Sequence, residues 1–173
     1  MKKTLFLSFP KLMTFFFLGM LMSANAFAQT ASKPFVTVEG EVLKPLKLTL
    51  EHLLKLKQTE VKAKDRDGKE HIFKGVRLFD LLDSAGVTLG KELRGENLTK
   101  YVLIKAVDGY EVIFSLPEID PEFTGQTILI AYQMDGNPLP KGEGPFRIVA
   151  PNDKKPARWI RELTTIKVVF SKE

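Results

Sequence analysis

The stretch GPFRIVAPNDKKPARWIREL, residues 144–163, decides which fold and which kind of site this chain can build. It contains three arginines and Trp159, the only tryptophan of the 173 residues. Pro151 and Pro156 interrupt any single helix or strand, because proline lacks a backbone N–H and restricts the residue before it. A stiff loop therefore separates Arg147 from the Arg158-Trp159 pair. We interpret this arrangement as the wall of a pocket for a flat, polar, aromatic ligand.

The N-terminal segment indicates export. Lys2 and Lys3 precede an apolar run that extends to about residue 21. Ala26-Phe27-Ala28 then fits the small-x-small rule for cleavage by signal peptidase. We expect a Sec-type signal peptide over residues 1–28, cleavage after Ala28 and a mature protein in the periplasm.

Two other interpretations of this segment are weaker. An uncleaved membrane anchor needs about 20 apolar residues in a row, and Pro10 and Lys11 interrupt the run. Export in the folded state requires an Arg-Arg pair, which the segment lacks. The chain is therefore expected to cross the membrane unfolded and without a cofactor.

The mature chain has the size of one domain, with residues 29–34 as a leader and residues 35–173 as the domain. Removing the three signal-peptide lysines from the 26 basic residues leaves 23 against 21 acidic residues, so the basic character largely disappears. This balance gives no support to nucleic-acid binding. The absence of cysteine excludes disulfides, thiolate metal sites and thiol nucleophiles, and two histidines are too few for most metal sites.

Short apolar segments alternate with turn signals along the mature chain. Asp67-Gly68 and Asp108-Gly109 each predict a hairpin, since both dipeptides lie between strand-like segments. The fold class expected from this pattern is α+β, with a mostly antiparallel, barrel-like sheet core and short helices. Strands are predicted over 35–42, 61–64, 70–74, 101–107, 110–115, 126–133, 144–150 and 165–170, helices over 49–56 and 76–85, and helical turns over 116–119 and 158–162.

Several segments together carry a resemblance to a known family. VEGEVLKPLKLTLEHLL, KGVRLFDLLDSAG, VDGYEVIFSLPEID, DGNPL and the 144–163 stretch follow one another in an order that resembles the molybdopterin-binding domain of the sulfite oxidase family. The resemblance extends from about residue 35 to residue 170. Its most specific part is Gly144-Pro145-Phe146-Arg147 with Arg158-Trp159. Enzymes of that family hold molybdenum through a cysteine thiolate, and this chain has no cysteine.

The resemblance and the missing cysteine together imply a function. The chain is similar to small, cysteine-free periplasmic members of the fold that bind free pterins, some of which regulate an inner-membrane cyclic-di-GMP enzyme. We therefore expect a pterin sensor that contacts the periplasmic domain of a diguanylate cyclase or phosphodiesterase, and not an enzyme. Its ligand would be a pterin without molybdenum. Two alternatives stay open: a molybdopterin-dependent oxidoreductase or a subunit of one, and an interaction protein without a ligand.

The candidate site residues follow from the shape of a pterin, which needs an aromatic face, a carboxylate for its amino edge and a donor for its carbonyl. Trp159 would stack on the ring, Asp153 would accept from the amino edge, and Arg147 and Arg158 would donate. The alternative for these residues is structural: a core tryptophan, a turn aspartate and surface ion pairs.

Four further residues are weaker candidates for the site. Tyr110 could line the mouth of the pocket, and Tyr132 is either core or pocket wall. His52 and His71 are both expected to face solvent.

Overall fold

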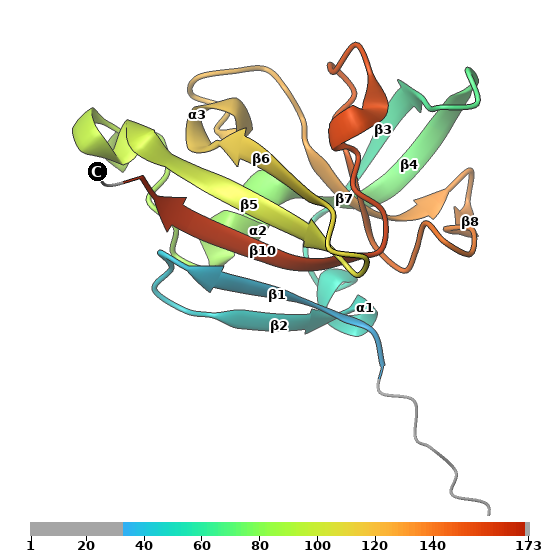
Figure 1. The fold of residues 1–173 in the computed structure, drawn as a ribbon, viewed down its shortest axis with the longest axis horizontal. Coiled ribbons are helices and arrows are strands. Elements are labelled where there is room, and N and C mark those ends of the chain that lie inside the picture. Colours follow the sequence, from blue (N-terminus) through green and yellow to red (C-terminus); the bar gives the residue numbers. More distant parts are fainter. Residues whose placement is uncertain (1–32, 172–173) are drawn as a thin grey trace, which may run out of the picture. The chain divides into compact units, whose positions relative to one another are not determined.

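The computed structural model describes residues 33–171 (Figure 1). The predicted signal peptide over residues 1–28 lies outside the described residues, as does most of the predicted leader, so cleavage after Ala28 stays a prediction. Within residues 33–171 no helix has the length and apolar character that a membrane crossing needs.

The first sheet has five strands in the order β2-β1-β10-β5-β6. Its central strands alternate between buried and less buried side chains, as β5 shows along its whole length. Only the β1–β10 pair is parallel among the strand pairs of the described chain. The strands are β1 (Phe35–Gly40), β2 (Leu46–Thr49), β5 (Lys100–Ala106), β6 (Glu111–Ser115) and β10 (Leu163–Phe170).

The second sheet is antiparallel and contributes the other side of the core. Its strand β7 buries four consecutive residues, because both of its faces are covered. Gly75 on β4 lies at a shift in register with β7, and a Cβ there would come within 2.0 Å of the Ile130 carbonyl oxygen. Only glycine permits this approach. The strands are β3 (Gln58–Lys64), β4 (Glu70–Arg77), β7 (Leu129–Met134), β8 (Asn137–Pro138) and β9 (Arg147–Val149).

The helices are short. The longest, α2 (Leu78–Ser84), buries Leu78, Leu81 and Leu82, which have the helical spacing of one apolar face. Ser115 and Glu118 form a capping box at the start of α3 (Leu116–Ile119). The remaining helical segments are α1 (Leu50–Leu53) and the 3₁₀ helices η1 (Gly90–Glu92), η2 (Gly95–Thr99) and η3 (Pro156–Arg158).

One hydrophobic core joins both sheets, since buried residues such as Phe114 and Ile166 of the first sheet cluster with Phe73 and Ile130 of the second. The α+β class with mostly antiparallel strands is confirmed. The element boundaries differ from those predicted. The strand predicted over 144–150 is only β9, and the helical turn predicted over 158–162 begins and ends earlier, because Pro156 sits at the first position of η3.

Candidate functional site

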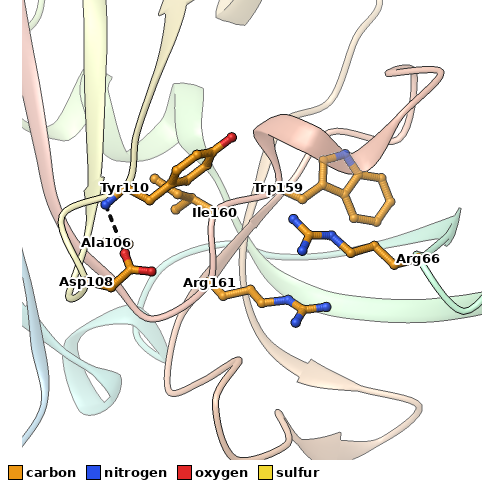
Figure 2. Close-up of a pocket in the computed structure, with 7 residues that line it drawn as sticks. All are labelled: Arg66, Ala106, Asp108, Tyr110, Trp159, Ile160 and Arg161. Atoms are coloured by element: carbon orange, nitrogen blue, oxygen red, sulfur yellow. Dashed lines mark hydrogen bonds between the residues drawn. The ribbon is translucent and has the colours of Figure 1, made fainter.

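A cavity of about 370 Å³, here called the Tyr110 pocket, opens where three distant segments meet (Figure 2). The β3–β4 turn contributes one arginine, the end of β5 and the β5–β6 turn contribute three residues, and the segment between η3 and β10 contributes three more. Its volume lies in the usual range for small-molecule sites, about 300–1,000 Å³. The lining residues are Arg66, Ala106, Asp108, Tyr110, Trp159, Ile160 and Arg161.

The β5–β6 turn presents a carboxylate and an aromatic ring to this pocket. Gly109 has a φ of 86°, and the Tyr110 backbone N–H donates to Asp108 Oδ1 at 2.9 Å, which closes the turn. The Tyr110 side chain is 50% exposed, and its hydroxyl donates to the Ala157 carbonyl at 3.1 Å. Tyr110 therefore ties the turn to the η3 segment while its ring stays accessible.

Trp159 forms an inner wall of the pocket but is mostly a core residue. Only 1% of it is exposed, and its indole N–H donates to the Ala150 carbonyl at 3.0 Å. Its ring meets that of Phe73 edge to face, with centroids 5.9 Å apart. A ligand in the pocket would contact part of the indole and not its whole face.

Arg147 is fully buried, next to Trp159 of the pocket wall. Its guanidinium donates to Asp65 at 2.8 Å and to Glu143, and it lies over the rings of Phe73 and Trp159, 5.2 and 5.7 Å from their centroids. Burial raises the pKa of Asp65, but the hydrogen bond and charge of Arg147 outweigh it, so that this pKa lies below its usual value. Arg147 is thus used by protein carboxylates and does not line the Tyr110 pocket.

Arg158 and Asp153 bond to each other. The guanidinium donates to both carboxylate oxygens, at 2.7 and 3.0 Å, and to Glu118 at 3.0 Å. It also covers the Phe114 ring at 4.2 Å. These bonds, first among them the one to Asp153, raise the pKa of Arg158. Neither residue lines the Tyr110 pocket.

Tyr132 lies in the second sheet, where its hydroxyl donates to Gln58 Oε1 at 2.5 Å. It is 5% exposed, and burial followed by the charge of Glu60 raises its pKa. Of the six candidate residues, the structure therefore brings Tyr110 and Trp159 to the pocket. It places Arg147, Asp153, Arg158 and Tyr132 elsewhere, and their role in ligand binding stays a prediction.

Sequence reasoning missed two arginines at the pocket. Within the described residues, the Arg66 guanidinium makes a single weak hydrogen bond, from Nη2 to the Pro156 carbonyl at 3.4 Å. Arg161 pairs with Glu143 at 3.1 Å, while its buried Nε has no hydrogen-bond partner in the described structure. Arg161 belongs to the 144–163 stretch and was open to inspection there, whereas Arg66 lies in a hairpin turn that only the fold brings near.

The two histidines differ from each other. His52 is exposed and takes part in the cap of α1, as its expected solvent-facing position allows. His71 instead is partly buried between two carboxylates, with Nδ1 at 2.6 Å from Asp135 and Nε2 at 3.1 Å from Asp67. His71 therefore joins the β3–β4 hairpin, which carries Arg66, to the β7–β8 turn.

Two comparisons place this fold among known proteins. Residues 67–173 match the family model described as "Oxidoreductase molybdopterin binding domain". Among solved structures, the sulfane dehydrogenase SoxCD from Paracoccus pantotrophus is similar, with a TM-score of 0.63 and 18% sequence identity. The similarity covers 80% of this chain and 38% of that chain, and at this identity it shows the fold alone. No curated protein sequence matches significantly. The resemblance to the sulfite oxidase-like domain is confirmed.

These comparisons correct one expectation, namely that the chain is not an enzyme. The matched family is described as a molybdopterin binding domain of oxidoreductases, so the family match points to an oxidoreductase-type molybdopterin domain, and the similar structure shows the same fold. The expectation was wrong because it rested on the missing cysteine and on the Sec-type signal, and neither describes the pterin-binding residues. A missing thiolate removes one ligand, whereas the pterin-binding fold is built from other residues.

The Tyr110 pocket fits the pterin part of such a cofactor. The Tyr110 ring offers an aromatic face, and Asp108 offers acceptors for an amino edge. Arg66 and Arg161 line the pocket with guanidinium groups, which can donate to a carbonyl or an anionic substituent. For a metal, the whole sequence offers no thiolate. Among residues 33–171 no three His, Asp or Glu side chains are grouped to hold a metal ion.

Proposed function

Because this chain belongs to the oxidoreductase molybdopterin binding domain family, we propose that it holds the pterin part of a molybdopterin-type cofactor in the Tyr110 pocket. It would serve as the cofactor domain or subunit of an oxidoreductase. Redox chemistry is supplied by the cofactor when bound, and the protein supplies binding and orientation. The observation that carries the proposal is the meeting of Tyr110, Asp108 and Arg161 around one cavity.

Each lining group has a distinct task in this proposal. Tyr110 stacks on the pterin, with Ile160 as an apolar wall. Asp108 accepts from the amino edge, and its Oδ1 is already oriented by the Tyr110 N–H. Arg161 is held in place by Glu143, so little side-chain entropy is lost when it donates to a ligand. The chain spans 38% of the similar dehydrogenase chain, and we propose that another chain or domain completes the reaction site.

The test is a titration of the mature protein with a pterin that carries a phosphate and with the same pterin without it. Trp159 is the only tryptophan and lines the pocket, so its fluorescence should change on binding, and calorimetry gives the affinity. Asp108→Asn preserves the turn acceptor Oδ1 but removes the charge. This variant and Arg161→Gln should each bind about 10- to 100-fold more weakly, the loss of a hydrogen bond to a charged group.

The matched control is Asp83→Asn, which removes an exposed carboxylate on α2 outside the pocket. It should bind like the wild type. Equal affinities for all four proteins would place the ligand elsewhere or nowhere.

We propose a regulatory role as a second candidate, in which the pterin-loaded domain acts in the periplasm on an inner-membrane cyclic-di-GMP enzyme. The absence of cysteine from the sequence favours it. Elemental analysis of protein purified from its native cells separates the two candidates. About one molybdenum per chain supports the oxidoreductase, whereas a metal-free pterin together with pterin-dependent binding to the membrane enzyme's periplasmic domain supports regulation.

A further inference from the structure

A second cavity, of about 360 Å³, lies at the other end of β5 from the Tyr110 pocket. Lys100 begins β5 at this end, whereas Ala106, which lines the Tyr110 pocket, ends it. The loop after β1, the loop after α2 and the first residue of β5 form its walls. The cavity, here called the Lys100 pocket, is lined by Gly40, Glu41, Val42, Leu43, Gly86, Thr88 and Lys100.

Lys100 is the unusual residue of this pocket, because it is a lysine that is only 8% exposed. Its ammonium donates to Thr88 Oγ1 at 3.1 Å and lies 5.2 Å from the centroid of the Phe170 ring. No carboxylate of the described chain lies within ion-pair distance of it, although Glu41 also lines the cavity. Lysine is almost never this buried without a charged partner. The ammonium therefore has donor capacity to spare on the side of the cavity.

The walls of the Lys100 pocket are held in place by close backbone packing. Gly40 has a φ of 91°, and a Cβ there would come within 2.0 Å of the Val168 carbonyl oxygen. A Cβ on Gly86 would come within 2.8 Å of the Leu43 side chain. The Lys44 N–H donates to the Ala85 carbonyl at 3.0 Å, which joins the two loops. The cavity is thus preformed, which lowers the ordering cost of binding.

We propose that the Lys100 pocket binds a small oxyanion, a carboxylate or a phosphate. The Lys100 ammonium supplies the charge and free N–H donors, and the Thr88 hydroxyl, which accepts from Lys100, can donate its own proton to the same anion. The ligand is recognised by its negative oxygens. This site is separate from the Tyr110 pocket, and neither proposal depends on the other.

The test is titration of the mature protein with sodium phosphate and, separately, sodium acetate, at constant ionic strength set with sodium chloride. Amide NMR spectra should show saturable shifts at Thr88 and Lys100, and the thermal midpoint should rise along the same curve. Phosphate also stabilises proteins without binding to a site, so saturation is the criterion. Shifts that grow linearly, or that spread evenly over the surface, overturn the proposal.

The matched pair of variants is Lys100→Met, which keeps an unbranched stem, and Lys91→Met, which removes an exposed lysine on η1. Affinity should fall about 10- to 100-fold in Lys100→Met, the loss of a charged hydrogen-bond donor, and stay unchanged in Lys91→Met. Equal responses of both variants overturn the proposal. Should Lys100→Met not fold, Thr88→Val removes only the hydroxyl and should weaken binding by a smaller factor.

Discussion

The ion-pair cluster around Arg147 and the neighbouring Tyr110 pocket use their arginines in opposite ways. In the cluster, the arginine is buried, two carboxylates accept from it and it lies over two aromatic rings. In the pocket, the exposed Arg66 side chain makes one weak hydrogen bond, and the partly exposed Arg161 side chain pairs with one carboxylate. An arginine within a recognisable motif can therefore serve the fold, while neighbouring arginines line the cavity.

The two regions are connected through adjacent and shared residues. Asp65 pairs with Arg147 in the cluster, and the next residue, Arg66, lines the pocket. Glu143 accepts from both Arg147 and Arg161. A change in the cluster will therefore alter stability first and the position of the pocket arginines second.

The largest effect is expected from Trp159→Ala, which empties a core position that the two regions share. The free energy of unfolding should fall by about 3–5 kcal/mol, the usual cost of truncating a buried tryptophan. Urea unfolding followed by circular dichroism measures it, because the variant has no tryptophan to report. Tyr110→Ala is the control, with an exposed ring on the same pocket and an expected cost of at most about 1 kcal/mol. Similar costs for both would contradict a core role for Trp159.

Asp65→Asn tests the buried cluster and should lower the free energy of unfolding by about 1–3 kcal/mol, because Arg147 loses a charged acceptor. The effect depends on pH. Since the pKa of Asp65 is below its ordinary 3.8 in the folded state, the carboxylate contributes stability above pH 3.8 and loses it as the pH falls through the lower, folded pKa. Urea unfolding from pH 7 to pH 3 should show the difference from the wild type shrinking. A pH-independent difference would mean that the charge of Asp65 is not involved.

Asp153→Asn tests where the ligand binds. The Arg158–Asp153 pair is partly exposed, so its loss should cost no more than about 1 kcal/mol of unfolding free energy. Pterin affinity should be unchanged if the ligand lies in the Tyr110 pocket. A clear loss of affinity with an intact fold, measured by calorimetry, would instead support the sequence-based placement of the ligand on Asp153.

The smallest effect on the free energy of unfolding is expected from replacing His71, which bonds the hairpin that carries Arg66 to the β7–β8 turn. Hydrogen bonds to Asp135 and Asp67 raise the pKa of His71 above 6.5. Its contribution to stability is therefore full below pH 6.5 and is lost as the pH rises through the folded pKa. The stability difference between wild type and His71→Gln should decline between pH 6 and pH 9 in urea unfolding. His52→Gln, at the exposed cap of α1, serves as the control, and an identical decline in both variants would assign the effect to another group.

The sequence by itself determined the fold class and the family. Asp67-Gly68 and Asp108-Gly109 form the predicted hairpin turns, and Leu78, Leu81 and Leu82 form the predicted apolar face of α2. These features depend on local turn chemistry and on the helical period, which a sequence displays directly. The ordered motifs around Arg147 and Arg158-Trp159 were sufficient to identify the family.

Only the tertiary structure decided which polar side chains line a cavity and which pair with other side chains of the protein. Arg147 and Arg161 have the same chemistry and lie in the same stretch. The Arg147 side chain is fully buried with two protein carboxylates within reach, whereas the Arg161 side chain is 34% exposed, pairs with one carboxylate and lines the pocket. The carboxylate that occupies Arg147 comes from Asp65, 82 positions away. Partners at such separations are set by strand pairing and burial across the whole chain, and those long-range contacts leave no local pattern in the residues around each arginine.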